Sequence, residues 1–213
     1  MKLTTTLKWT ALLVFMLPGF LWAHHPMGGS TPTSFAEGII SGFAHPLIGI
    51  DHFAFIISVG FLAFFLSRNY FLPAFFISGT VLGTGLHLLA FNLPAVEVII
   101  ALSVALGGLL LIWQKSTLKT GFYMALFSLA GIFHGYAYGE AVIGAEPTPI
   151  AAYLLGFAAI QYLVALGAMF LISRIAHGTN LSESVILRVS GGIVTGISIV
   201  IISDLLLAFS GIS

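Results

Sequence analysis

Residues 47–66 read LIGIDHFAFIISVGFLAFFL, a run in which Asp51 and His52 are the only ionisable side chains. An α-helix rises about 1.5 Å per residue, so about 20 apolar residues are enough to span the hydrocarbon core of a bilayer. The run therefore predicts a membrane-spanning helix that carries its two polar residues near one end.

Five further apolar runs lie C-terminal to this one, at residues 70–91, 95–113, 121–138, 150–172 and 185–209. Helix breakers or polar residues separate them, as at Asn92-Leu93-Pro94, residues 114–117, residues 146–149 and residues 174–184. The pattern predicts an all-α integral membrane protein, a six-transmembrane-helix bundle that forms one membrane domain over residues 24–213. Ahead of it, residues 33–44 are predicted as a short interfacial helix.

The composition agrees with a membrane protein. Of 213 residues, 59% are hydrophobic and only 7% are charged, whereas soluble domains have about 25% charged residues. The formal net charge is zero, so no basic patch is available for nucleic acid, and the expected surroundings are the lipid bilayer. The absence of cysteine excludes disulfides, thiolate metal sites and cysteine nucleophiles.

The N-terminus resembles a targeting segment. Lys2 and Lys8 precede a short apolar run, and Ala23 provides a small residue at a cleavage point. We predict a signal peptide over residues 1–23, so that the mature chain begins at His24. The alternative is an uncleaved anchor, because Leu21 departs from the usual small residue three positions before cleavage.

The basic residues predict the orientation. With the mature N-terminus outside, alternating loops place five basic residues on the cytoplasmic side, as the positive-inside rule requires: Arg68, Lys115, Lys119, Arg174 and Arg188. The prediction is a multi-pass protein of the inner (plasma) membrane whose two mature termini are both extracytoplasmic.

The strongest local motif is His45-Pro46-Leu47-Ile48-Gly49-Ile50-Asp51-His52. We expect Pro46 at the first helical position and His45 at the cap. In a regular helix His45 and His52, seven residues apart, share a face, and Asp51 is either a metal ligand or a group that orients an imidazole. A capping role at a helix end is the alternative, but three such residues in a weakly charged membrane chain favour a metal site.

A second motif covers residues 133–140, FHGYAYGE. His134 and Tyr138 are four apart and so lie on one helix face. The alternative for His134 is a hydrogen bond to the backbone of a neighbouring helix. Glu140 is expected at the outer end of the same helix.

Two further histidines complete the candidate set. His87 either faces the same cluster or has a structural role. A terminal His24 offers its α-amine and ring nitrogen as a capture site, the alternative being an unstructured tail. The predicted topology places all candidate metal ligands on the outer side: His24, His45, Asp51, His52, His87, His134 and Glu140. Imidazole with carboxylate suits Ni, Co, Zn or Cu(II) rather than Mg or Ca.

Glycines recur at intervals of four, at Gly79/Gly83, Gly131/Gly135/Gly139 and Gly192/Gly196. Such stripes let a neighbouring helix approach closely, and we interpret most of them as plain helix packing.

The two motifs together resemble the HupE/UreJ family of nickel/cobalt permeases. The first motif of that family consists of a His, five residues of any type, and then Asp-His, and this chain matches it in full. The second motif is Phe-His-Gly-x-Ala/Val-His-Gly-x-Glu, and the chain matches it at Phe133, His134, Gly135, Ala137 and Gly139. Tyr138 and Ala141 depart from it, where the family has His and Glu; Glu140 or Glu146 is the candidate substitute for the latter. The resemblance implies uptake of Ni²⁺ or Co²⁺ that supplies hydrogenase, urease or cobalamin synthesis.

The predicted function is therefore transport of Ni²⁺ or Co²⁺ into the cytoplasm, with the ion as substrate, no prosthetic group and no enzymatic activity. The sequence lacks a Walker A motif, which argues against direct use of ATP. Two alternatives are an intramembrane zinc-dependent hydrolase, although the sequence has neither HExxH nor GxSxG, and a non-transporting accessory protein. A homo-oligomer or a metal-delivery partner is left open.

Overall fold

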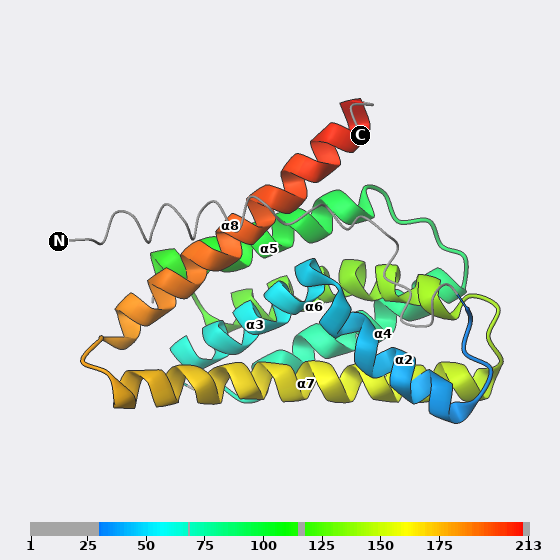
Figure 1. Ribbon diagram of the computed structural model, residues 1–213, viewed down its shortest axis with the longest axis horizontal. Helices are drawn as coiled ribbons and strands as arrows, with labels where there is room; N and C mark the ends of the chain where they lie inside the picture. The colour runs from blue at the N-terminus through cyan, green and yellow to red at the C-terminus, as the bar shows by residue number, and fades with distance from the viewer. Residues whose placement is uncertain (1–29, 68, 115–117, 211–213) are drawn as a thin grey trace.

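The computed structural model describes residues 30–67, 69–114 and 118–210. These residues form seven α-helices and one short 3₁₀ turn, without a strand (Figure 1). The elements are α2 (Phe35–Ile48), α3 (Ile50–Phe65), α4 (Leu72–Leu88), α5 (Val96–Trp113), α6 (Thr120–Gly139), η1 (Glu140–Val142), α7 (Pro147–Gly178) and α8 (Glu183–Ser210). The all-α prediction is confirmed. The predicted signal peptide and His24 lie outside the described residues.

The helix predicted over residues 47–66 begins instead at Ile50, as α3, and the helix predicted over residues 33–44 extends to Ile48, as α2. α2 begins at a capping box, in which the Ser34 hydroxyl accepts from the Glu37 N–H at 3.2 Å and the Glu37 carboxylate accepts from the Thr33 N–H at 2.7 Å. It continues through Pro46 and ends at Gly49, where the chain bends by 81° into α3. The predicted positions of His45 at a cap and Pro46 at a first helical position are therefore wrong, because both lie in the last turn of α2.

Within the described residues, three helices are long and apolar enough to cross a membrane, namely α5, α7 and α8, and the bent pair α2–α3 adds a fourth candidate span. Helix α4 has 17 residues, which is short for a span. Helix α6 has 20 residues, but its glycines, tyrosines and His134 reduce its apolar character. The predicted count of six spans is therefore not confirmed by length and composition, although one helix covers most of each predicted run.

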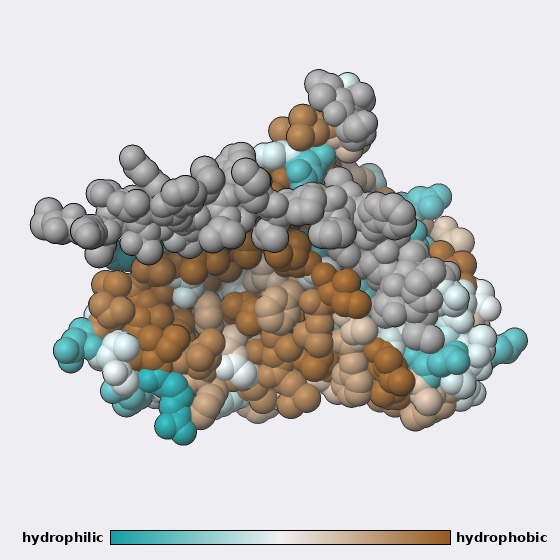
Figure 2. Space-filling model, in the orientation of Figure 1, coloured by the Kyte–Doolittle hydropathy of each residue, from teal (hydrophilic) through white to brown (hydrophobic). Residues whose placement is uncertain are grey.

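Hydrophobic and hydrophilic residues occupy separate parts of the surface, as is typical of a membrane protein. Figure 2 shows hydrophobic residues across the middle of the molecule and hydrophilic ones at its two ends. Large apolar side chains remain exposed on several helices, for example Leu155 and Leu163 on α7 and Ile193 and Ile199 on α8. An apolar surface of this extent is unfavourable in water and is typical of contact with lipid.

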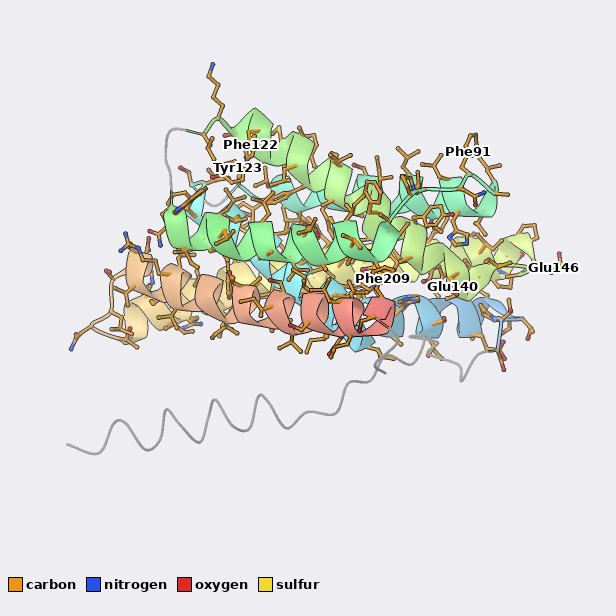
Figure 3. The ribbon with its side chains drawn as sticks, turned by 90° about the horizontal axis from the view of Figure 1, so that it is seen from above. Phe91, Phe122, Tyr123, Glu140, Glu146 and Phe209 are labelled. Atoms are coloured by element: carbon orange, nitrogen blue, oxygen red, sulfur yellow. The ribbon has the colours of Figure 1, made fainter. Side chains whose placement is uncertain are left out.

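The two ends of the bundle differ in charge. Lys119, Arg174 and Arg188 lie near the end where α6 begins, α7 finishes and α8 starts; Gln114 joins α5 to α8 there by donating to the Ser184 carbonyl at 2.7 Å. Arg68 and Lys115 lie outside the described residues. Glu140 and Glu146 lie at the opposite end (Figure 3).

Helices α4 and α6 form the closest helix pair, as two of the glycine stripes predict. A Cβ added at Gly83 would overlap the Ile132 carbonyl oxygen, and one added at Gly135 would overlap the Thr80 backbone. By contrast, nothing lies within 4 Å of a Cβ added at Gly192 or Gly196 on α8. The α8 stripe therefore faces no neighbouring helix within the described residues.

We predict opposite effects for two alanine substitutions that are two residues apart on α4. Gly83→Ala should lower the free energy of unfolding by about 1–3 kcal/mol, because its methyl group forces α4 away from α6. Gly85→Ala meets nothing within 4 Å, so it should be neutral or stabilise by up to about 1 kcal/mol. Thermal unfolding in detergent measures both, and equal shifts in Tm would contradict the close-approach argument.

Candidate functional site

The bend at Gly49 brings the two histidines of the first motif together from different helices. His45 on α2 and His52 on α3 are both buried, and their ring centroids are 6.0 Å apart. The His52 ring folds back toward the bend, so a Cβ at Gly49 would lie 2.6 Å from its Cδ2 atom. The expectation that a regular helix aligns the two imidazoles is wrong, since the break, rather than a shared helix face, makes them neighbours.

His52 also contacts the histidine of the second motif. The Nδ1 atoms of His52 and His134 are 2.7 Å apart, which joins α3 to α6 by a hydrogen bond between two buried rings. The second ring nitrogen of His134, Nε2, is 2.9 Å from the Ser103 hydroxyl on α5. His134 is thus held by side chains of two other helices, not by a neighbouring backbone.

This chain of hydrogen bonds assigns a tautomer to each neutral ring. The Ser103 hydroxyl donates to the Ile100 carbonyl at 2.7 Å, so toward His134 it accepts, and His134 carries its proton on Nε2. The Nδ1 atom of His134 is then an acceptor, and His52 donates from its own Nδ1. The other ring nitrogen of His52, Nε2, lies on the side of Asp51, 4.0 Å from its Oδ1 atom.

His45 is oriented in the same way by Tyr153 on α7. The Tyr153 hydroxyl donates to the Tyr138 carbonyl at 2.9 Å and lies 3.0 Å from His45 Nδ1. Since that hydroxyl hydrogen is used, His45 donates from Nδ1. The rings of His45 and His52 are thus each oriented by a hydrogen bond at Nδ1, as the rings of metal-binding histidines commonly are.

Tyr138 lies against both rings, with centroid distances of 5.1 Å to His45 and 4.5 Å to His52. Its hydroxyl is buried and has no hydrogen-bond partner among the described residues. A phenol ring therefore lies beside the two imidazoles, at the position where the motif of the resembled family has a histidine.

Asp51 supplies the nearby negative charge. It lies in the first turn of α3, where the helix dipole favours a carboxylate. Its Oδ1 atom accepts from the His52 backbone N–H at 2.8 Å and lies 4.0 Å from His52 Nε2. Both roles predicted for Asp51, as a ligand and as an orienting group, are compatible with this position.

An apolar wall closes the cluster on one side. The Phe55 ring stacks on His134 at 4.8 Å, and the Phe76 ring meets it edge-on at 5.5 Å. These rings exclude water from the His52–His134 hydrogen bond, which strengthens the interactions between charges and dipoles in the site.

The separation of His45 and His52 permits a shared ion. With metal–nitrogen distances of about 2.1 Å, an imidazole centroid lies about 3.2 Å from the ion, so two rings on one ion have centroids up to about 6.4 Å apart. Over residues 30–67, 69–114 and 118–210, however, no three His, Cys, Asp or Glu side chains are arranged as a metal site. A bound ion would therefore have few protein ligands and retain other oxygen ligands.

The remaining predicted ligands lie away from this cluster or outside the described residues. The His87 Nδ1 atom donates a hydrogen bond to the Tyr136 carbonyl of α6 at 2.7 Å, and the His87 ring is 4.3 Å from that of Tyr136. This agrees with the structural alternative for His87. Glu140 is exposed in η1 at the end of the bundle (Figure 3).

Sequence reasoning missed Ser103 and Tyr153. Each is a polar side chain in an apolar run, which is a usable signal in a membrane protein. However, a single sequence does not indicate which histidine each one meets across the bundle.

The fold and the cluster define a class of protein: a helical membrane protein that buries imidazole, carboxylate and phenol groups from several helices. Residues 12–201 match the family described as HupE / UreJ protein, and the chain belongs to this family. Protein HupE of Rhizobium leguminosarum bv. viciae is 29% identical over 196 residues, which cover 91% of this chain and 93% of that protein. No solved structure gives a significant match. The family is generally associated with nickel and cobalt transport.

We predict that Tyr153→Phe destabilises the protein by about 1–3 kcal/mol, because it leaves the His45 Nδ1 donor and the Tyr138 carbonyl buried without their shared partner. The control is Tyr162→Phe on the same helix, which removes an exposed 3.3 Å hydrogen bond to the Tyr70 carbonyl and should change stability by less than about 0.5 kcal/mol. Thermal unfolding in detergent distinguishes them, and an unchanged Tm for Tyr153→Phe would argue against the assigned bond.

Proposed function

We propose that the protein transports a divalent transition-metal ion, Ni²⁺ or Co²⁺, across the inner (plasma) membrane into the cytoplasm. The observation that supports this most is the buried cluster of His45, Asp51 and His52 beside Tyr138, contributed by α2, α3 and α6. Ionisable side chains are costly within a membrane, and where they gather they mark ion pathways.

The donor set favours a borderline metal ion. Two imidazole nitrogens, one carboxylate and one phenol oxygen suit Ni²⁺ or Co²⁺ better than Mg²⁺, which prefers oxygen ligands alone. The described part of the chain has no preformed arrangement of three His, Cys, Asp or Glu ligands. A site with few protein ligands binds weakly enough to release its ion, which transport requires.

The proposed orientation follows from charge and from the position of the cluster. Lys119, Arg174 and Arg188 lie near the end of the bundle opposite to Glu140 and Glu146, and the positive-inside rule assigns the basic end to the cytoplasm. In this arrangement six helical spans follow a cleaved signal peptide, and the exposed carboxylates attract cations from outside.

We predict that His52→Ala and His45→Ala each reduce Ni²⁺ and Co²⁺ uptake by at least about tenfold, because each removes a nitrogen ligand oriented by a neighbouring hydrogen bond. The matched control is His177→Ala, since His177 is exposed in the last turn of α7 and its ring donates to the Ser173 carbonyl of the same helix at 2.6 Å. Uptake into proteoliposomes is the measurement.

Three results of that experiment would each have a clear meaning. Wild-type uptake in both His45→Ala and His52→Ala would overturn the proposed ion site. Metal binding without flux in the wild-type protein would favour the accessory alternative. Loss of uptake in His177→Ala as well would indicate a general defect rather than the loss of a ligand.

A second prediction concerns the position at which this chain departs from the family motif. Tyr138→His places a third imidazole beside His45 and His52 and should lower the Kd for Ni²⁺ and Co²⁺ by about tenfold or more, since imidazole is the better ligand for these ions. Tyr136→His, on the same helix but beside His87, is the control. Equilibrium dialysis of the purified protein measures both, and equal Kd values would contradict a ligand role at position 138.

A further inference from the structure

Helix α7 carries one buried side chain that the candidate site does not use. Gln161 is 1% exposed, and neither its amide oxygen nor its amide nitrogen has a hydrogen-bond partner among the described residues. A buried amide without partners is destabilising, so its presence needs a reason other than stability. The buried residues one turn before and one turn after it on α7, Phe157 and Ala165, belong to apolar clusters.

The position of Gln161 between two apolar regions is distinctive. One buried cluster contains Tyr138, Tyr153 and Phe157, and the other contains Ala165, Met169 and residues of α3. Gln161 lies on the same face of α7, one turn from Phe157 and one turn from Ala165. It is therefore the polar interruption between the two apolar clusters along this helix.

The register between α3 and α7 places Gln161 close to the imidazoles. Gly60 faces the Ala165 carbonyl, and both helices run in the same direction (Figure 1). One turn before Gly60 on α3 is Ile56, which is level with Gln161, the residue one turn before Ala165 on α7. His52 lies one further turn back along α3. Gln161 is thus about 6 Å, or one helical turn, further toward the basic end than His52.

Phe157 lies beside the candidate site, one turn before Gln161 on α7. Its ring is 5.5 Å from that of Tyr138 and 5.4 Å from that of Tyr153. Beyond Gln161, toward the end that carries Arg174, the buried residues of α7 are apolar: Ala165, Ala168, Met169 and Ile172. Gln161 is therefore the last buried polar side chain of α7 in that direction.

We propose that Gln161 is a second binding station for the hydrated metal cation, one helical turn inward of the imidazole cluster and of Phe157. This inference rests on the proposed transport function. The amide oxygen accepts hydrogen bonds from water bound to the ion or binds the ion directly. Because the amide is uncharged, it holds the cation weakly, which suits a step that must be followed by release.

The test compares Gln161→Met and Gln161→Glu with the wild-type protein in proteoliposomes loaded with a metal-sensitive dye. Methionine has nearly the same length as glutamine but lacks its oxygen and nitrogen. Met169→Leu, a substitution of similar volume two turns further along the same face, is the control for repacking. Co²⁺ binding is followed by its visible absorption spectrum, and folding by Tm.

The expected result is a separation of binding from flux. Gln161→Met should retain Co²⁺ binding within about twofold, keep or raise Tm, and reduce the initial rate of Co²⁺ uptake by about tenfold or more, because only the inward step loses its oxygen. Gln161→Glu restores an oxygen and should transport faster than Gln161→Met. Met169→Leu should transport like the wild type.

Other outcomes would overturn the inference and identify what failed. Uptake by Gln161→Met within about twofold of the wild-type rate would exclude a binding station. A lowered Tm with equal losses of uptake in Gln161→Met and Gln161→Glu would assign Gln161 a structural role. If the wild-type protein binds Co²⁺ but transports neither Co²⁺ nor Ni²⁺, the proposed function itself fails, and the inference with it.

Discussion

The hydrogen bond between the Nδ1 atoms of His52 and His134 is the interaction on which the rest of the candidate site depends. A buried imidazole must have partners for both nitrogens or leave one exposed to a ligand. Because His134 bonds both His52 and Ser103, it aligns the His52 ring, whose Nε2 atom lies 4.0 Å from Asp51 Oδ1. The two hydrogen bonds of His134 thus connect α3, α5 and α6 and fix the orientation of the His52 ring.

The architecture explains how such a polar cluster is tolerated in an apolar bundle. The 81° bend at Gly49 sets α3 nearly at a right angle to α2, and His45 and His52 meet across it with ring centroids 6.0 Å apart. Close contact between α4 and α6, which depends on Gly83 and Gly135, holds His134 firmly against α3. Aromatic side chains such as Phe55 and Phe157 then surround the polar groups. The ordering of the site is therefore a consequence of helix packing.

The proposed pathway links these features in one direction along α7. Tyr153 orients His45, Phe157 lies beneath Tyr138, and Gln161 follows one turn later. Polarity decreases along this sequence, from imidazole and carboxylate to an uncharged amide and then to alanine and isoleucine. A gradient of this kind reduces the affinity for a cation step by step, so that capture at one end is compatible with release at the other.

The sequence by itself determined the all-helical class, the apolar runs, and the identity of His45, Asp51, His52 and His134 as candidate residues, because charged and imidazole groups are rare and costly in a membrane chain. The matched motifs also predicted the HupE/UreJ family, which the comparison confirmed. Only the tertiary structure decided that α2 continues through Pro46 and ends at a bend. It also decided that Tyr138, Tyr153 and Ser103 join the cluster and that His87 bonds the α6 backbone. These features depend on which helices face each other, and hydrophobic periodicity along one chain indicates which residues are apolar but not which neighbour they meet.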